Sequence, residues 1–127
     1  YITIASTGDA TDFGDLTVAR RQTLAACSDG TKGVFGGGRT AAATEDNTID
    51  YITIASTGNA TDFGDLTVAR RRFSACSDGT KGVFGGGFSS SSYLNVIDYI
   101  TIASTGDATD FGDLTVGRYG SGAFSGD

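Results

Sequence analysis

A twenty-residue stretch occurs three times in the chain, and this repetition limits the possible fold more than any other feature. Residues 1–20 read YITIASTGDATDFGDLTVAR, and the same stretch returns at residues 51–70 and 99–118 with one substitution each, Asn59 and Gly117. The copies begin 50 and 48 residues apart. Self-similarity at such a period is typical of repeat proteins, in which each unit buries its apolar face against the next.

Each unit predicts four short antiparallel strands. The chain has 20 Gly, no Pro, and short runs of Ile, Val, Leu, Phe and Tyr, which favour strands over helices. Within the repeated stretch, a Gly-Asp or Gly-Asn turn separates two β-forming runs and predicts one hairpin. Asp29-Gly30 and Asp78-Gly79 predict a second hairpin in each unit. Bulky side chains on both faces of the strand at Tyr51 indicate a sheet that lies between other sheets.

The second strand of this second hairpin ends in a glycine triplet, with Gly36 and Gly37 in one unit and Gly85 and Gly86 in the next. Glycine at such a place marks a bulge or a point where another backbone comes close. The functional alternative is a phosphate-cradling loop. However, VFGGG lacks the Lys-Ser/Thr pair and the following helix of a P-loop, and it lacks the spacing of GxGxxG. We therefore interpret these glycines as structural.

The charge of the chain argues against several kinds of partner. With 15 acidic and 9 basic residues the net charge is −6, which repels a phosphate backbone, so we expect no nucleic acid partner. No run approaches the roughly 20 apolar residues that span a bilayer, so we expect no membrane partner. Basic clusters lie at the unit junctions, where salt bridges or carbonyl contacts between units explain them more simply than a phosphate site. These clusters are Arg20-Arg21 and Arg70-Arg71-Arg72.

The residue types present leave little scope for catalysis. The chain has no His, which excludes Ser-His triads and His-containing metal sites within it. Cys27 and Cys76 occupy the same place in successive units, and Phe124 takes that place in the third, so the position is an apolar one. Equivalent positions on face-packed sheets lie about 10 Å apart, beyond the reach of a disulfide. We expect two free, buried thiols, no enzyme activity, no cofactor and no metal.

Aspartates recur three residues apart in each copy of the repeated stretch, as at Asp9, Asp12 and Asp15. Calcium takes about six to eight oxygens, and its best-known loop reads DxDxDG with a distal Glu, which this pattern does not match. Paired carboxylates of a glycosidase stay open as an alternative. Their occurrence in every unit favours a structural role in turns or on the surface.

The units differ in sequence after the glycine triplets. Residues 39–48 read RTAAATEDNT, whereas residues 88–96 read FSSSSYLNV, although the neighbouring strands are nearly identical. Variable length and identity on a fixed scaffold are typical of an exposed loop. The alternative to a binding loop is a solvated connector without a ligand. The candidate binding residues are Arg39, Thr40, Phe88 and Tyr93.

These features together resemble kelch repeats. The family's order is an Asp-Gly hairpin, an apolar strand ending in Gly-Gly, an Asn that enters the third strand and an aromatic residue in the fourth. This order is visible at residues 72–75, 78–79, 83–86, 94–97 and 111–114. The resemblance covers essentially the whole chain. It implies a β-propeller, a radial ring of four-stranded antiparallel blades that leaves only short, protected edges.

Two features depart from the family. Phe13, Phe63 and Phe111 stand where kelch repeats usually have Trp, and the hairpin around Gly58 is longer than the family's norm. We therefore expect the blade to be preserved and its outer edge to be altered. The three phenylalanines and the two glycine pairs form the repeat signature of this chain.

The resemblance divides the chain into parts of one propeller domain. A closed ring uses typically 4 to 8 blades, so at roughly 49 residues each we expect a piece of a ring that a longer chain or several copies complete. An open β-solenoid is the rival architecture. The expected parts are residues 1–19 as the outer hairpin of a partial blade, 20–69 and 70–117 as complete blades, and 118–127 as the first strand of a further blade.

The nearly verbatim copies are also similar to kelch-like repeats of virion and tail proteins of marine tailed bacteriophages. This similarity implies a non-enzymatic structural or adhesive protein that is located in the phage particle, or is otherwise extracellular. Its partners would be other virion proteins or a host surface receptor or glycan. The alternatives are a cellular kelch adaptor that binds a protein, and a propeller that binds or acts on carbohydrate.

Overall fold

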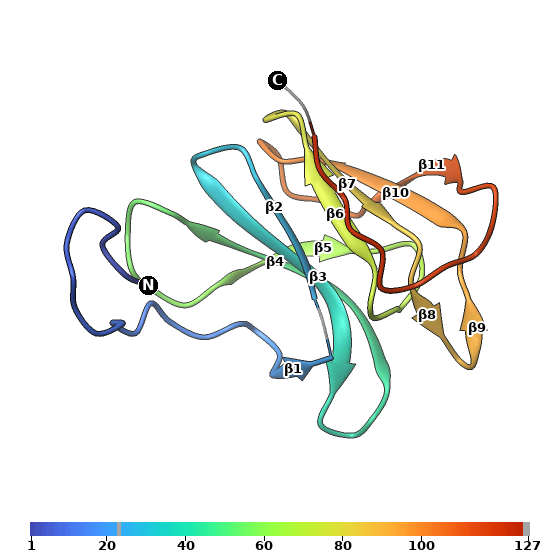
Figure 1. The fold of residues 1–127 in the computed structure, drawn as a ribbon, viewed down its shortest axis with the longest axis horizontal. Coiled ribbons are helices and arrows are strands. Elements are labelled where there is room, and N and C mark those ends of the chain that lie inside the picture. The colour runs from blue at the N-terminus through green and yellow to red at the C-terminus, as the bar shows by residue number, and fades with distance from the viewer. Residues whose placement is uncertain (23, 126–127) are drawn as a thin grey trace.

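The computed structural model describes residues 1–22 and 24–125, and these residues are all-β. The first unit contains β1 (Arg20–Arg21), β2 (Ala25–Ser28), β3 (Lys32–Thr40), β4 (Glu45–Thr53) and β5 (Thr61–Asp65). Strands β2 to β5 form an antiparallel meander in which each strand pairs with the next (Figure 1). The short β1 pairs with the end of β3.

The second unit repeats the meander and adds a small ribbon to it. The meander consists of β6 (Ser74–Ser77), β7 (Lys81–Gly85), β10 (Val96–Thr101) and β11 (Thr109–Asp113), and the ribbon of β8 (Phe88–Ser89) and β9 (Ser92–Tyr93). The prediction of four antiparallel strands per unit is confirmed. In the part of the chain that the structure describes, no helix has the length and apolarity to cross a membrane.

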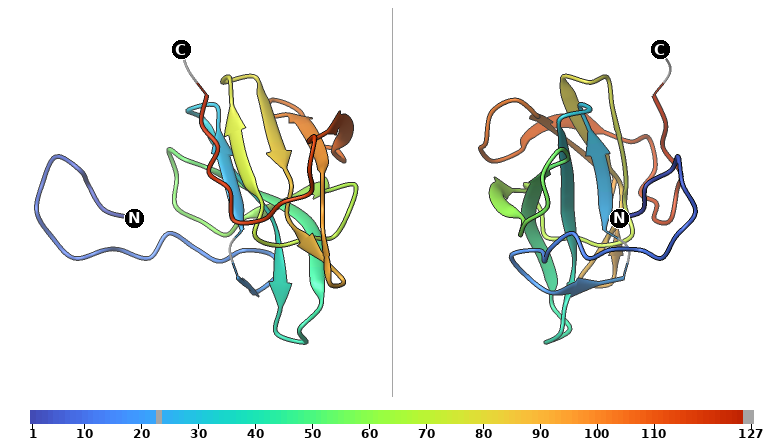
Figure 2. Two further views of the ribbon diagram at one scale, coloured as in Figure 1. Left: turned by 45° about the vertical axis from the view of Figure 1, so that its right-hand side comes forward. Right: turned by 90° about the vertical axis from the view of Figure 1, so that its left-hand side faces the viewer.

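The two meanders lie face to face, with β2 beside β6 (Figure 2). The core lies between them: Val34 and Ile49 from the first unit and Phe84 and Ile102 from the second are fully buried. Burial of each such side chain contributes about 1.5–3 kcal/mol relative to its exposed state. The core therefore belongs to the junction of two units, as a repeat architecture requires.

The predicted Asp-Gly turns are confirmed. The Asp29 carboxylate accepts the backbone N–H groups of Thr31 and Lys32, both at 2.7 Å, and Gly30 takes a φ of 86°. These hydrogen bonds, the one from Lys32 first, hold the pKa of Asp29 below its usual value. The turn at Asp78 is built in the same way, and its pKa is lowered for the same reason.

The glycine triplets lie where a second backbone approaches. Strand β3 has a bulge after Gly36, and Gly37 lies there with a φ of 58°. A Cβ at Gly37 would lie 2.6 Å from the carbonyl oxygen of Arg70. In the second unit, a Cβ at Gly86 would lie 2.8 Å from the carbonyl oxygen of Arg118. The prediction of a close backbone approach is therefore confirmed in both units.

Each signature phenylalanine packs edge-on against the tyrosine that opens its copy of the repeated stretch. The pairs are Tyr1 with Phe13, Tyr51 with Phe63, and Tyr99 with Phe111, and their ring centroids lie 5.8, 5.9 and 5.8 Å apart. Phe63 is 3% exposed, whereas Phe111 is 59% exposed. The difference arises because the next copy of the stretch covers Phe63, where Gly106 N–H donates to the Phe63 carbonyl at 2.7 Å.

Buried ion pairs join each copy of the repeated stretch to the following unit. The Arg70 guanidinium lies 2.8 Å from the Asp98 carboxylate, and the Thr67 hydroxyl donates to Asp98 at 2.5 Å. Both side chains of the ion pair are fully buried. Burial lowers the pKa of Arg70, and Asp98 opposes this shift. Arg20 and Asp50 form the equivalent pair at the start of the first unit. Arg71 of the second unit lies 3.3 Å from the carboxylate of Glu45 in the first, so the prediction of salt bridges between units is confirmed.

The N-terminal stretch departs from the strand prediction. The sequence predicts a hairpin in residues 1–19, but the structure has no strand there. Tyr1 and Thr11 do exchange two backbone hydrogen bonds, of 2.7 and 2.8 Å, as the equivalent residues of β4 and β5 pair. The strand prediction is wrong because no strand equivalent to β3 lies beside this stretch to extend it into a sheet.

The C-terminal segment also differs from the predicted strand. Residues 118–125, predicted as part of a first strand, form no strand and run beside β6 (Figure 1); residues 126 and 127 of that prediction lie outside the described residues. The Ser125 hydroxyl donates to the Ser77 carbonyl, just as the Ser77 hydroxyl donates to the Ser28 carbonyl one unit earlier. The described part of the segment thus follows the path of a first strand without forming one.

The buried ion pair gives a first prediction. Asp98→Asn is expected to destabilise the protein by about 3–5 kcal/mol, because it leaves the Arg70 guanidinium buried without a counter-charge. The measurement is the free energy of unfolding in urea. The matched control is Asp113→Asn, which changes an exposed carboxylate and should stay within about 0.5 kcal/mol of the parent. A loss at Asp98 as small as that of the control would contradict the role of the pair.

The close backbone approach gives a second prediction. Gly37→Ala is expected to cost about 3 kcal/mol, because the new methyl group meets the Arg70 carbonyl and the left-handed backbone strains any residue with a Cβ. Gly120→Ala is the control, since its φ of 66° is similar but its Cβ would face open space. The control should cost about 1 kcal/mol. Equal losses in urea unfolding would show that crowding at Gly37 is absent.

Candidate binding surface

An exposed aromatic cluster lies on the ribbon of the second unit. Phe88 and Tyr93 face each other across β8 and β9, with ring centroids 5.8 Å apart. Tyr119, from the C-terminal segment, stacks on Tyr93 with centroids 5.1 Å apart and ring planes at 15°. We name these three residues the aromatic platform. Tyr93 and Tyr119 are 59% and 44% exposed, so two stacked rings of the platform stand in solvent.

A tight turn positions Tyr93 in the platform. Ser90 and Ser91 take φ values of 46° and 78°, and two successive positive φ values are typical of the type I′ turn that joins the strands of a hairpin. Serine lacks the conformational freedom of glycine, so each residue costs roughly 1–2 kcal/mol in this conformation. The Leu94 N–H also donates to the Gly87 carbonyl at 2.9 Å and closes the ribbon. The tyrosine is therefore held by a defined and strained loop.

Two arginines support the platform from the unit junction. The Arg71 guanidinium lies 5.0 Å from the centre of the Phe88 ring, and that of Arg72 lies 5.7 Å from the centre of the Tyr119 ring. Cation–π contacts of this kind contribute roughly 0.5–1 kcal/mol at exposed sites. Arg71 also lies 3.3 Å from the Glu45 carboxylate. Arg71 is thus paired, whereas Arg72 is exposed beside the ring that it contacts.

The other two predicted binding residues lie on a separate hairpin. Arg39 and Thr40 end β3, where Arg39 donates to the Ala43 carbonyl at 2.8 Å and the hydroxyls of Thr40 and Thr44 lie 2.8 Å apart. These bonds close the turn between β3 and β4 on itself. Both hairpins extend toward the same end of the molecule (Figures 1 and 2). The structure therefore brings Phe88 and Tyr93 together and leaves Arg39 and Thr40 on a neighbouring hairpin.

Sequence reasoning missed Tyr119. This residue aligns with Arg71 of the preceding unit, so the third unit replaces a basic residue of the junction by an aromatic one. This replacement is visible in the sequence, because it falls in an otherwise similar junction. It does not by itself indicate a binding residue, since nothing in the sequence shows that Tyr119 contacts Tyr93, 26 residues earlier on the ribbon.

The recurring aspartates act locally. Asp12, Asp62 and Asp110 each accept the backbone N–H of the glycine two residues later, at 3.1, 3.2 and 3.0 Å. Burial raises the pKa of Asp65, and the nearby carboxylate of Asp107 adds to this shift. Within residues 1–22 and 24–125 no three Cys, Asp or Glu side chains come together as a metal site. The carboxylates thus shape the outer turns of the units.

One thiol lies at the junction between the two sheets, at Cys27, and the other lies on the outer face of the second sheet, at Cys76. Cys27 and Cys76 are free, as predicted, and both are partly buried, where full burial was expected. Burial raises the pKa of Cys27 to about 12, and Cys76 and Asp29 add to the rise. A thiol with such a pKa is a poor nucleophile at neutral pH, because the thiolate is the reactive form. Cys27 therefore fills space between the sheets.

The chemistry of the platform suits a ligand with a flat ring face. Stacked tyrosines offer an apolar surface whose edges carry hydroxyl groups, and the serines of the adjacent turn add further hydroxyls. A pyranose ring fits such a surface, because its C–H face packs on aromatic rings while its hydroxyls bond at the edge. Exposed aromatic residues held rigidly are also typical energetic centres of protein interfaces.

Comparisons with known proteins leave the family open. No protein-family model matches this chain, and no curated protein matches it significantly. The kelch resemblance of the sequence therefore stays a prediction, while the all-β antiparallel architecture is established by the structure.

Proposed function

We propose that this protein is a non-enzymatic structural or adhesive component of a phage particle, built as part of a kelch-like propeller that presents its loops to a host surface. The mechanism is recognition by shape. Rigid units hold loops in place, and a ligand binds without any covalent chemistry. The similarity of the repeats to those of phage virion and tail proteins supports the location in the particle.

One observation carries the adhesive role: the aromatic platform is exposed on the segment in which the units differ. The strands beside it are copied almost verbatim, and the junctions that they form are buried and ion-paired. Function in repeat scaffolds concentrates on variable loops that a fixed framework positions. The platform is both variable in sequence and held by the fixed framework, because Tyr93 lies on the divergent loop and Tyr119 in the divergent C-terminal segment.

A surface glycan is the ligand that the platform favours. Two stacked tyrosines and neighbouring serine hydroxyls provide the apolar face and the hydrogen-bonding edge that a sugar ring needs. The exposed Arg72 beside Tyr119 adds one local cation, which would pair with a single carboxylate of an acidic sugar. The net charge of −6 disfavours a polyphosphate or nucleic acid at the same place.

The glycan assignment is tested by binding to immobilised bacterial surface polysaccharides, including acidic ones. Tyr93→Ala and Tyr119→Ala are each expected to weaken binding by roughly tenfold or more, because each removes one ring of the stack. Phe124→Ala is the control: Phe124 is 92% exposed and precedes Ser125, whose hydroxyl donates to the Ser77 carbonyl of β6, so it lies beside β6 and not on the ribbon. Binding that none of the platform variants changes would place the ligand elsewhere, and the absence of binding to every polysaccharide would reject the glycan.

The location in the particle has its own test. Trypsin cleaves after Lys81 and Arg118 and releases residues 82–118 as one peptide, which includes the divergent loop and the third copy of the repeated stretch. Mass spectrometry of purified phage particles from a culture that carries this gene should detect this peptide at constant stoichiometry to the other virion proteins. Detection only in the host cell fraction would contradict a virion role and favour a cellular adaptor.

A further inference from the structure

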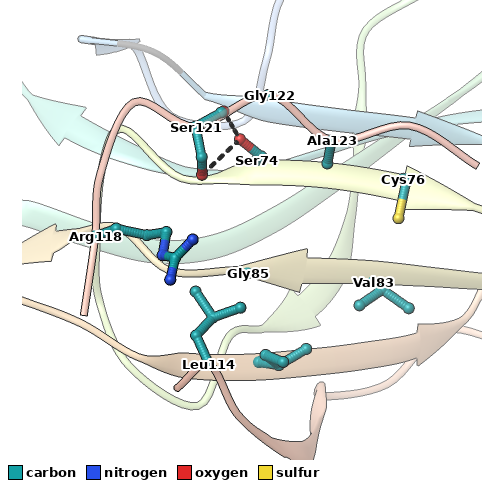
Figure 3. Close-up of a pocket in the computed structure, with 10 residues that line it drawn as sticks. Ser74, Cys76, Val83, Gly85, Leu114, Arg118, Ser121, Gly122 and Ala123 are labelled. Carbon is teal, nitrogen blue, oxygen red and sulfur yellow. Dashed lines mark hydrogen bonds between the residues drawn. The ribbon is translucent and has the colours of Figure 1, made fainter. Parts of the chain in front are cut away.

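The outer face of the second unit has the residues of a unit junction, but no unit among the described residues covers it. The face of the first unit toward the second is made of Ala25, Val34, Ile49 and Leu66, and Arg70 of the junction completes it; none of these residues is more than 5% exposed. Their counterparts in the second unit are partly exposed, or exposed in the case of Arg118, and line an open pocket of about 220 Å³ (Figure 3). These counterparts are Ser74, Val83, Ile97, Leu114 and Arg118.

The covered junction shows what fills such a pocket. Phe84 of the second unit is fully buried, and a Cβ at Gly36 would lie 3.5 Å from its ring. Phe73 packs edge-on against Phe84 with centroids 6.1 Å apart. At the uncovered face, Ser121 stands at the position of Phe73, and a Cβ at Gly85 would meet nothing within 4 Å. The pocket therefore has the place for an aromatic ring that the described residues leave empty.

The charged residues at this face also match those of the covered junction. In the covered junction, Arg70 and Thr67 together bind the Asp98 carboxylate. Arg118 and Thr115 repeat these two residues at the uncovered face. Among the described residues Arg118 forms no ion pair, and its guanidinium donates to the Val116 carbonyl at 3.1 Å (Figure 3 shows it over the pocket). A carboxylate in the place of Asp98 would complete the arrangement.

At the outer edge of the second unit, residues that are covered in the first unit are again exposed. A Cβ at Gly64 would lie 2.4 Å from the Gly106 carbonyl oxygen, so the next copy of the stretch packs directly on this glycine. Gly112, the counterpart of Gly64, has a similar φ of 131° but faces open space. Phe111, the counterpart of the covered Phe63, is exposed.

The backbone already follows the path of a junction at this face. The Arg118 carbonyl accepts the Gly87 N–H at 2.8 Å, as the Arg70 carbonyl accepts the Gly38 N–H at 2.9 Å one unit earlier. The bond from Ser125 to β6 likewise repeats the bond from β6 to β2. The face therefore continues an established interface rather than ending it.

We propose that this face binds one further copy of the repeat unit, whose aspartate equivalent to Asp98 pairs with Arg118 and Thr115 and whose phenylalanine equivalent to Phe84 fills the pocket. The recognition is directional, because the partner must present its Phe- and Asp-bearing face to the Val- and Arg-bearing face of this unit. It does not depend on the ligand of the aromatic platform.

The test extends the 127-residue chain by a copy of residues 80–118, appended after Asp127. Arg118→Gln is then made in the extended chain and in the parent. It should lower the melting temperature of the extended chain by about 10 °C, because a buried carboxylate loses its partner, and that of the parent by much less. Arg21→Gln, at an exposed arginine, is the control and should leave both chains nearly unchanged.

A second readout follows the thiol that lines the pocket. In a Cys27→Ser background, the rate at which iodoacetamide modifies Cys76 reports the exposure of this face. The appended unit should slow the reaction by at least about tenfold, since Cys76 would enter the environment that Cys27 has in the covered junction. Asn in place of the appended aspartate should restore part of the rate.

Three outcomes would overturn the inference. The first is an appended unit that leaves the Cys76 rate unchanged, and the second is an Arg118→Gln effect of equal size in both chains. The third is concentration-dependent protection of Cys76 in the parent, seen together with dimers in sedimentation, because a second copy of the chain would then be the occupant. None of these outcomes bears on glycan binding by the platform, so the two proposals stand or fall separately.

Discussion

The buried pair of Arg70 and Asp98 is the interaction on which the arrangement of the two units depends. It connects the end of one copy of the repeated stretch to the centre of the next sheet, and both side chains are inaccessible to water. Two buried charges are tolerated only if they meet with good geometry, because each alone is strongly destabilising. Apolar contacts permit a range of packings, so the pair fixes the register of one unit on the next.

This constraint explains why the repeated stretch varies so little while the loops vary freely. Gly37 must stay small because the Arg70 carbonyl crosses it, and Thr67 must carry a hydroxyl to orient Asp98. The ribbon beyond Gly87 projects from the edge of the unit, and it meets the junctions through backbone groups, as where Phe88 and Arg71 exchange hydrogen bonds. Its side chains are free of this requirement. A binding surface can change there without disturbing the junctions.

The structural features that recur in both units could be predicted from the sequence. Four antiparallel strands per unit, the Asp-Gly turns, the crowded glycines and the ion-paired arginines all follow from local pattern and from comparison of the copies. Sequence reasoning failed at residues 1–19, because strand formation there needs a neighbour that local pattern does not report. It also missed Tyr119 in the platform, since the contact with Tyr93 depends on the path of the chain after the third copy.

The two faces of a unit are different, and this difference determines how units can assemble. The first unit presents Val34 to one side, together with Arg70 of the junction, and the second unit contributes Phe84 and Asp98 to the same interface. An interface between unlike faces is heterologous, so each added unit presents a new copy of the face that was just covered. Such addition ends only when a fixed rotation per unit brings the last face onto the first, or when a different surface covers it. The rotation between successive sheets therefore decides between a closed ring and an open stack, which are the two architectures that the repeat allows.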